Sequence, residues 1–469
     1  MPVPRPPGPR DRLFGLSLLR DMERDYLAFW RRAQRDHGDT IYLRVGKVDT
    51  YAFLHPDQIR EVLVDKASSF IRYEHHMKVL SQMHGQSVLI SEGAKWQQQR
   101  RMLLPSFSPK RFDAYARQMV EAAEGVLDGL PADTPVDFEH AMNMLAMDVV
   151  LRTMFGTRVE GDTRAIEAAV TDLSLIAYEE MFAVVRLPDW LPLPSLRHKR
   201  RAMALLMDLI GGQIAARRAG PPGQDDLLGM LLAARDDEGD GSTLSDVQVR
   251  DQLMTIFFAG HDTTASGLGW AGWLLASHPD IAARAAAEVD AVLGGRVPGY
   301  ADVARLPFLG QCIKEVLRLF PPAPGVFMRR AAEDVQIGPW QVPKGALVSI
   351  VSVLPQRDPR WFPDPGRFDP DRFAPELARQ VPRGAYFPFG TGPRVCIGNS
   401  FAAIEMTLVL AMLLQRFVLR PAPGQSEPGI RLQVTLRPAG GVRLVLSARA
   451  ALAPVAAPAA AGCPFHAAG

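Results

Sequence analysis

One long run of helical spacing constrains this chain more than any other feature. Ser245 and Gln248 form a capping-box pattern, which predicts the start of a helix. Apolar residues then recur at helical spacing to about Ser277, where His278-Pro279 predicts the end. Roughly 33 residues in one helix would span about 50 Å at 1.5 Å per residue. A helix of that length must cross a globular molecule from side to side, so the fold has to be built around it.

Polar residues interrupt the middle of this helix, at Gly260, Asp262, Thr263 and Thr264. Glycine in a helix costs about 1 kcal/mol, and a buried unpaired acid costs more. In one interpretation Thr263 bonds the carbonyl four residues back and Asp262 meets a surface arginine. In the other, the helix opens locally beside a ligand, and the acid and the alcohol pass protons. The pattern alone leaves both open.

Composition excludes several classes of protein. Of 469 residues, 47% are hydrophobic and 22% charged, which is typical of a globular chain, and the net charge of +2 is too small to hold a nucleic acid. No run of 18 apolar residues exists, so we expect no membrane span. The Pro-rich start lacks the apolar core of a signal peptide. We therefore expect a cytoplasmic protein, and a monomer.

The predicted fold class is mainly α with a small β subdomain. Residues 1–10 read as a Pro-rich extended arm, 11–448 as one large domain and 449–469 as a disordered Ala/Pro-rich tail. A helical stretch is expected at about 17–36, and alternation predicts a strand pair at 40–46 and 50–54 and short strands at 335–337 and 346–350. Near the end, 432–436 and 442–446 alternate across Gly440-Gly441, which predicts a hairpin.

The second informative feature is a cysteine loop. Cys396 precedes an apolar helix expected at about 399–418, whose N–H groups and dipole favour a thiolate, and Arg394 adds a cation. A lone cysteine is usually a small buried apolar residue. Here, however, the pattern F-x-x-G-x-R-x-C-x-G is met at every fixed position, by Phe389, Gly392, Arg394, Cys396 and Gly398. This loop resembles the haem-thiolate signature of the cytochrome P450 superfamily.

The resemblance extends over nearly the whole chain. Trp96 and Arg100 resemble the family's W-x-x-x-R, and residues 259–264 resemble its oxygen-activation motif. Glu315 and Arg318 match E-x-x-R, and a P-x-R-F-like segment ends at 371–373. The resemblance implies the cytochrome P450 fold, with haem between the long central helix and the cysteine-loop helix.

By this resemblance the cofactor is haem b (iron protoporphyrin IX), with Cys396 as the ligand of its iron. Two haem carboxylates entering a protein need cations. The expected partners are Arg100, Arg394 and Arg329, for which neighbouring Arg330 is an alternative, with the indole N–H of Trp96.

Glu315 and Arg318 lie three residues apart on one helical face, so they can pair and offer a further bond to Arg372. We expect these three charges to pin the coil before the cysteine loop against the core. The alternative is an exposed helical ion pair worth about 0.3 to 0.5 kcal/mol.

The implied activity is a monooxygenase that inserts one oxygen atom of O2 into a hydrophobic small molecule, with Asp262 and Thr263 delivering protons. No G-x-G-x-x-G unit for NAD appears, so electrons are expected from a separate ferredoxin or flavodoxin with its NAD(P)H reductase. The expected docking patch, against the alternative of solvated side chains, is Arg100, Arg101, Lys110, Arg111 and Arg394. Other possibilities are a peroxide-driven hydroxylase, which Asp262-Thr263 disfavours, and a haem-thiolate sensing protein.

For the substrate, a fatty acid, terpene, steroid or similar molecule is expected. The candidate contacts implied by the resemblance are apolar: Leu89, Met181, Phe182, Phe258, Ala259, Val326 and Phe327. Lys47 and Tyr51 resemble the segment with which bacterial fatty-acid hydroxylases hold a carboxylate, but Asp49 adds a repelling charge and a solvated strand face is the alternative.

Overall fold

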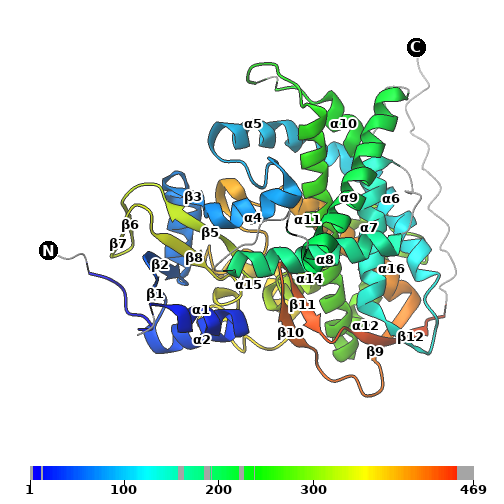
Figure 1. The fold of residues 1–469 in the computed structure, drawn as a ribbon. Coiled ribbons are helices and arrows are strands. Elements are labelled where there is room, and N and C mark those ends of the chain that lie inside the picture. The colour runs from blue at the N-terminus through cyan, green and yellow to red at the C-terminus, as the bar shows by residue number, and fades with distance from the viewer. Residues whose placement is uncertain are drawn as a thin grey trace, which may run out of the picture.

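The computed structural model contains a large helical body with a smaller β region beside it (Figure 1). It describes residues 4–11, 14–156, 163–183, 191, 193–220, 226–236 and 238–450. The prediction of a mainly α fold with a small β part is confirmed. The tail from 451 to 469 lies outside the described residues.

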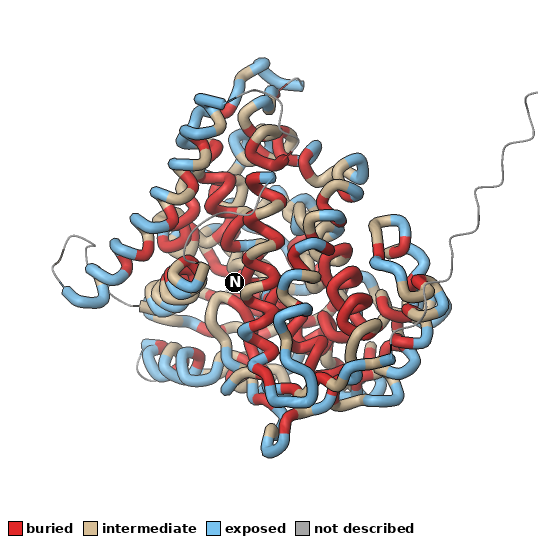
Figure 2. The backbone as a smooth tube through the Cα atoms, turned by 90° about the vertical axis from the view of Figure 1, so that its right-hand side faces the viewer, coloured by how far each residue is buried: buried red, intermediate tan, exposed pale blue. Residues whose placement is uncertain are grey.

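The predicted central helix is present as α11 (Asp246–Ser277), which runs unbroken for 32 residues. The Ser245 hydroxyl accepts from the Gln248 N–H, and the Gln248 side chain accepts from the Ser245 N–H, so both halves of the capping box form. Buried residues dominate the helix, and Figure 2 shows such residues running through the middle of the molecule. The chain is therefore packed around α11, as its length requires.

The remaining helices cover α11 and the sheet. In the first half they are α1 (Leu16–Arg24), α2 (Tyr26–His37), α3 (Pro56–Arg60), α4 (Glu74–His84), α5 (Gly93–Leu103), α6 (Pro109–Leu127), α7 (Phe138–Phe155), α8 (Thr163–Phe182), α9 (Pro194–Ala219) and α10 (Leu227–Ala233). In the second half they are α12 (Pro279–Leu293), α13 (Tyr300–Val303), α14 (Pro307–Leu319), α15 (Pro375–Ala378) and α16 (Asn399–Arg416). The stretch predicted at 17–36 is two helices, because Asp25 is extended and caps α2 through Ala28 N–H. Among the described helices, none is both long and apolar enough to cross a membrane.

The largest sheet has the order β1-β2-β8-β5-β3, with β2 and β8 parallel and the other pairs antiparallel. Its strands are β1 (Thr40–Val45), β2 (Val48–Phe53), β3 (Phe70–Arg72), β5 (Val326–Ala331) and β8 (Leu347–Ile350). Smaller sheets join β6 (Val335–Ile337) to β7 (Trp340–Val342), β10 (Gly429–Leu432) to β11 (Leu436–Ala439), and β4 (Pro135–Asp137) to β12 (Arg443–Ala448) and β9 (Phe417–Pro421). The predicted strand pair at 40–54 is confirmed.

The hairpin predicted across Gly440-Gly441 is wrong. The strand at 436–439 pairs backward with 429–432, whereas the strand at 443–448 pairs with β9 and β4. Alternation identifies a half-buried strand but not its partner. Leu444 and Leu446 are fully buried, so burial against other elements of the core accounts for their pattern.

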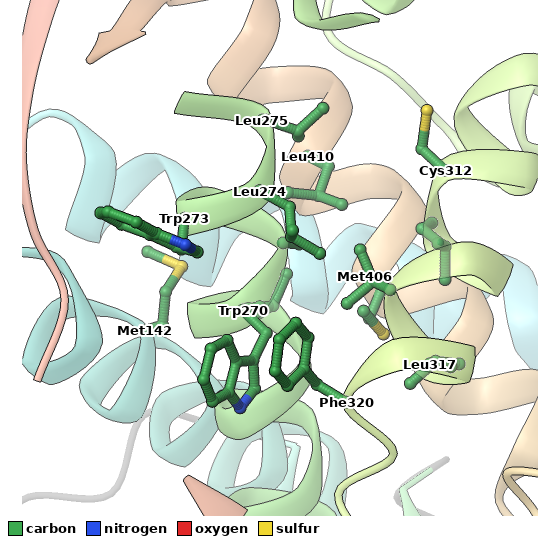
Figure 3. Packing of buried hydrophobic residues seen from close by; sticks show 14 of the residues in the cluster. Met142, Trp270, Trp273, Leu274, Leu275, Cys312, Leu317, Phe320, Met406 and Leu410 are labelled. Atoms are coloured by element: carbon green, nitrogen blue, oxygen red, sulfur yellow. The ribbon is translucent and has the colours of Figure 1, made fainter. Parts of the chain in front are cut away.

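The core between α11, α14 and α16 is tightly packed (Figure 3). Trp270 of α11 stacks on Phe320 with ring centroids 3.7 Å apart and planes 3° apart. Cys312 of α14 lies in the same cluster and is buried, which raises the pKa of its thiol. Cys312 is thus the ordinary small apolar cysteine of this chain.

The described part of the Pro-rich arm is extended and lies against the sheet. Tyr42 N–H donates to Pro7 O at 2.9 Å, and Gly8 passes so close that a Cβ there would lie 1.7 Å from Tyr42 O. Arg5 ion-pairs with Asp49 at 3.3 Å and lies over the Tyr42 ring. The arm therefore covers the edge strand β1, whose N–H groups would otherwise be unpaired.

Candidate active site

The cysteine loop is held in a compact conformation by its own backbone. Cys396 N–H donates to Phe389 O at 2.9 Å, and Val395 N–H donates to Gly392 O at 3.1 Å. Gly392 has φ +72°, and a Cβ on it would lie 1.9 Å from Leu63 O. Only glycine fits this position, because both the backbone conformation and the close approach exclude a side chain.

Cys396 differs from Cys312 in its surroundings. The Cys396 side chain is exposed, yet neighbouring protein atoms desolvate its sulfur and raise the pKa of the thiol. The Gly398 N–H and the charge of Arg100 act in the opposite direction and favour the thiolate. Ile397 packs against the apolar cluster that contains Phe258 of α11. A sulfur that is accessible but enclosed by protein, at the start of α16, is suited to binding a metal centre.

Four arginines gather beside this loop. Arg72 of β3 and Arg329 of β5 are direct partners in the sheet register, and Arg394 and Arg100 approach from the cysteine loop and α5. Arg72 is buried, and desolvation together with the neighbouring arginine charges lowers its pKa to about 9. Desolvation also lowers the pKa of Arg394, to about 10, and that of Arg329.

One carboxylate lies close to this arginine cluster in the described chain. Glu92 ion-pairs with Arg394, and its charge partly offsets the lowering of the Arg72 and Arg329 pKa values. The Arg72 Nε is buried with no hydrogen-bond partner among the described residues. Because buried cations need anions, the cluster is suited to a ligand that carries two carboxylates, and haem fits this requirement.

Trp96 belongs to the same cluster. The Arg394 guanidinium lies 3.9 Å from the centroid of the Trp96 ring, and the Arg100 guanidinium lies 5.9 Å from it.

The choice between Arg329 and Arg330 as a haem partner is also clear from geometry. Arg330 pairs with Glu74 at 2.7 Å and donates to Gly345 O at 2.7 Å, so Arg329 is the one that joins the cluster.

Sequence reasoning missed Arg72, because no recognised motif covers it. Its signal is indirect: Arg72 lies in a short strand paired with the strand of Arg329, and that pairing is not readable from either segment alone.

The polar residues of α11 form hydrogen bonds without opening the helix. The Thr263 hydroxyl donates to Ala259 O at 2.7 Å, as the first of the two interpretations states. Asp262 accepts from the Thr435 hydroxyl at 2.5 Å and ion-pairs with Arg437, which is buried and not at the surface. The local opening expected in the second interpretation is absent from α11, whose backbone is helical throughout.

Arg437 lies between two acids. Besides Asp262, it approaches Glu139 of α7 at 3.7 Å, and burial raises the pKa of Glu139. On the adjoining face of α11, Ala259 is exposed and Thr263 half-buried, in the middle of an otherwise buried helix. The acid and the alcohol are therefore neighbours in sequence with different surroundings: one held in an ion pair, the other accessible.

Four of the seven predicted apolar substrate contacts share one apolar cluster. Phe258 belongs to it, and Leu89, Met181 and Phe327 pack against it. Phe182 instead contacts the rings of Tyr26 and Tyr178, and Val326 packs against a second cluster. Lys47 and Tyr51, the two residues expected to hold a fatty-acid carboxylate, differ in how far they are buried.

Lys47 is exposed in the turn between β1 and β2, whereas Tyr51 is buried and 2% exposed. Burial and the nearby Asp49 charge raise the pKa of Tyr51. Arg5 and Arg44 ion-pair with Asp49, at 3.3 and 3.5 Å, so charges of both signs lie near Tyr51.

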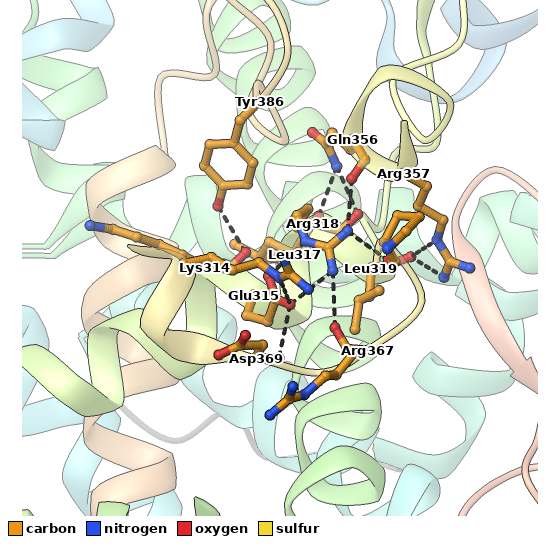
Figure 4. Close-up of polar contacts among 12 residues, drawn as sticks. Lys314, Glu315, Leu317, Arg318, Leu319, Gln356, Arg357, Arg367, Asp369 and Tyr386 are labelled. Atoms are coloured by element: carbon orange, nitrogen blue, oxygen red, sulfur yellow. Dashed lines mark hydrogen bonds and ion pairs between the residues drawn. The ribbon is translucent and has the colours of Figure 1, made fainter. Parts of the chain in front are cut away.

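Glu315, Arg318 and Arg372 do meet, and Figure 4 shows the contacts of Glu315 and Arg318. Glu315 accepts two bonds from Arg318, at 2.6 and 2.8 Å, and Arg372 Nε lies 3.4 Å from its carboxylate. Arg318 also donates to the carbonyls of Gln356, Pro365 and Arg367. Both Glu315 and Arg318 are fully buried, so the alternative of an exposed helical pair is wrong.

The predicted basic patch is largely used for other contacts. Arg394 faces Glu92 and Trp96, and Arg101 makes two bonds to Asp236, at 3.1 and 3.0 Å. Lys110 remains exposed at the start of α6. Of the five cations of the expected docking patch, Arg394 and Arg101 are therefore ion-paired with Glu92 and Asp236.

Comparison with known proteins agrees with this geometry. The family model described as cytochrome P450 matches residues 4–444. The chain belongs to the cytochrome P450 family. The sequence prediction of a cytochrome P450 enzyme is confirmed at that level.

Two similar proteins come from Streptomyces species. Cyclooctatin synthase of Streptomyces melanosporofaciens is 38% identical over 87% of this chain and 88% of its own length. Pentalenene oxygenase of Streptomyces avermitilis is 31% identical over 88% of this chain and 91% of its own. Among solved structures, the retinoic acid-bound cyanobacterial CYP120A1 has a TM-score of 0.83 and 28% identity, covering 96% of this chain and 100% of that one.

Proposed function

We propose that this P450 is a haem b monooxygenase that adds one oxygen atom of O2 to a terpene or terpenoid substrate. The observation that carries the proposal is the accessible, enclosed Cys396 sulfur beside a cluster of four arginines. The names of cyclooctatin synthase and pentalenene oxygenase support the terpene class, since both cover most of this chain.

Residues of the chain itself are suited to hold the cofactor. Cys396 would bind the iron, and Arg72, Arg100, Arg329 and Arg394 would hold the two carboxylates of the haem, with the Trp96 N–H beside them. Phe389, Gly392 and Gly398 shape the loop around the sulfur. When bound, the haem activates O2, and its thiolate ligand donates electron density that favours O–O cleavage.

Protons would reach this site along α11. Thr263 keeps its hydroxyl oxygen as an acceptor, because its proton is donated to Ala259 O. Arg437 holds the Asp262 carboxylate and also lies 3.7 Å from Glu139, so Asp262 would take up a proton only when Arg437 moves away from it. Burial raises the pKa of Glu139, so this acid holds a proton to a higher pH than an exposed glutamate would. Asp262, adjacent to Thr263 in sequence, would pass the proton on, and its ion pair with Arg437 would control when it does so.

The surroundings of Phe258 support a largely apolar substrate, since Leu89, Met181 and Phe327 pack against the same apolar cluster and Ala259 beside it is exposed. Electrons would come from a separate ferredoxin or flavodoxin with its NAD(P)H reductase; the cytoplasmic location and the monomeric state also stay predictions.

The deciding experiment is optical. The purified protein, reduced and exposed to carbon monoxide, should show the red-shifted band of a thiolate-bound ferrous haem, and Cys396→Ser should lose it together with turnover. Cys312→Ser is the matched control, since Cys312 is buried in the core, and it should keep the band. A thiolate band that survives Cys396→Ser would refute the assignment.

Turnover separates the related functions. Product from a terpene with NAD(P)H, a ferredoxin and its reductase supports the monooxygenase. Product with peroxide alone would identify a peroxide-driven hydroxylase, and an intact thiolate band without any product would identify a sensing protein.

A further inference from the structure

Four polar side chains lie together in the apolar wall between α4 and α11. They are His84, Ser87, Gln252 and Thr255, called here the α4–α11 polar group, and their exposed fractions are 4%, 0%, 0% and 5%. The residues around them, which include Phe258, form one of the apolar clusters of the fold. Burying polar groups in such surroundings costs free energy unless they are hydrogen-bonded.

The group is only partly satisfied by its own contacts. The Thr255 hydroxyl donates to Ser87 Oγ at 2.6 Å and lies 3.3 Å from His84 Nδ1. Gln252 Oε1 accepts from Val88 N–H at 3.0 Å, which fixes the orientation of the amide. The Gln252 Nε2 is then buried with no hydrogen-bond partner among the described residues. A buried donor left in this state is destabilising, and a bound acceptor would recover that cost.

The group is uncharged at neutral pH. Burial lowers the pKa of His84 to about 4, so its ring is neutral there. The adjacent acid, Asp251, is already bonded to Gln86 N–H and to Arg250, both at 2.8 Å. A neutral set of donors and acceptors is suited to a hydroxyl or carbonyl oxygen, and it offers no cation to a carboxylate.

The position of the α4–α11 polar group along α11 relates it to Thr263. Thr255, Ala259 and Thr263 are spaced four residues apart, so they lie along one face of α11. Eight residues of helix separate Thr255 from Thr263 by about 12 Å. Ala259, midway between them, is exposed, and the Phe258 ring lies 5.4 Å from that of His84. A molecule that reaches Thr263 along this face would bring its far end to the polar group.

We propose that the α4–α11 polar group binds an oxygen already present on the substrate, so that this P450 oxidises a terpenoid alcohol or ketone at a carbon about 12 Å from that oxygen along α11. This inference rests on the proposed monooxygenase function. The substrate must therefore come from a preceding step that installs an oxygen, which is either an oxidation or a cyclisation ended by water.

The same residues also hold the end of α4 against α11, through Ser87, Gln86 and Val88. A purely structural role would change stability without changing which ligand is preferred. The test must therefore compare two ligands on the same protein.

The probes are cedrene and its alcohol cedrol, farnesene and farnesol, and dodecanoate, each followed by the low-spin to high-spin shift of the haem. We expect at least one alcohol to bind about tenfold more tightly than its hydrocarbon, and dodecanoate to gain nothing. Thr255→Val and Gln252→Leu should each remove most of that preference while leaving hydrocarbon affinity within about twofold. Thr153→Val is the matched control, because Thr153 is a buried helical threonine of α7 that bonds Val149 O at 2.8 Å.

The outcomes separate the two proposals. A missing thiolate band refutes the haem assignment. An intact band with hydrocarbons bound as tightly as alcohols, or an alcohol preference unchanged in both variants, overturns only the inference about the polar group. If both variants fail to fold, the wild-type protein still provides a test. Tighter binding of an alcohol than of its hydrocarbon would support the inference, and equal binding would overturn it.

Discussion

At the scale of single residues, Thr263 performs two tasks with one hydroxyl group. Its proton is donated to Ala259 O at 2.7 Å, which leaves the oxygen as an acceptor on the accessible side of α11. We expect Thr263→Ala to keep the thiolate band but to lower product per NAD(P)H consumed at least severalfold, because water and protons are no longer held in place. Measuring NAD(P)H consumption and product in the same reaction checks this.

Thr263→Ser is the control for that change, because it keeps a hydroxyl at the same position and should retain most of the coupling. Equal coupling in Thr263→Ala and the parent would remove Thr263 from proton delivery.

Residue-level prediction names candidates where a family motif covers them and misses partners that only packing brings together. The motif at 389–398 named Cys396 and Arg394 through its resemblance to the haem-thiolate signature, and their roles stay predictions. Arg72 was missed because its role depends on a sheet register between segments far apart in the chain. The partner of Asp262, Arg437, was missed because it lies 175 positions away, in strand β11, and only packing brings it to α11.

At the scale of elements, the N-terminus of α11 depends on its capping box. Ser245 and Gln248 satisfy two N–H groups that a bare helix start leaves unpaired. We expect Ser245→Ala to lower the free energy of unfolding by about 1 kcal/mol, and Ser245→Asp to retain most of it. Urea unfolding of the haem-bound protein followed by circular dichroism measures both; equal stability of Ser245→Ala and the parent would show that the cap contributes nothing.

Elements with strong local signals could be predicted, whereas their pairing could not. The bounds of α11 follow from the cap and from His278-Pro279, both of which act within a few residues. The hairpin error at 440–441 arose because alternation in 443–448 reflects contacts with β9 and β4. Local spacing determines that a strand forms, but long-range packing determines which strand lies beside it.

At the scale of the whole molecule, the Glu315–Arg318–Arg372 cluster joins the coil before the cysteine loop to the core. Arg318 alone reaches three carbonyls of that coil, and Glu315 accepts from Asp369 N–H at 3.0 Å (Figure 4). The loop that carries Cys396 follows this coil directly in the chain. Stability of the fold and retention of haem should therefore fall together when the cluster is broken.

We expect Glu315→Gln to lower the free energy of unfolding by about 3 to 5 kcal/mol, because it leaves the fully buried Arg318 without its counter-charge. Haem should also transfer to apomyoglobin faster from the Glu315→Gln variant than from the parent. Asp371→Asn is the matched control: it removes a carboxylate whose ion pair with Arg284 is exposed, so it should cost less than about 1 kcal/mol. If Glu315→Gln lost stability while its haem transfer rate stayed that of the parent, the cluster would support the core without supporting the cysteine loop.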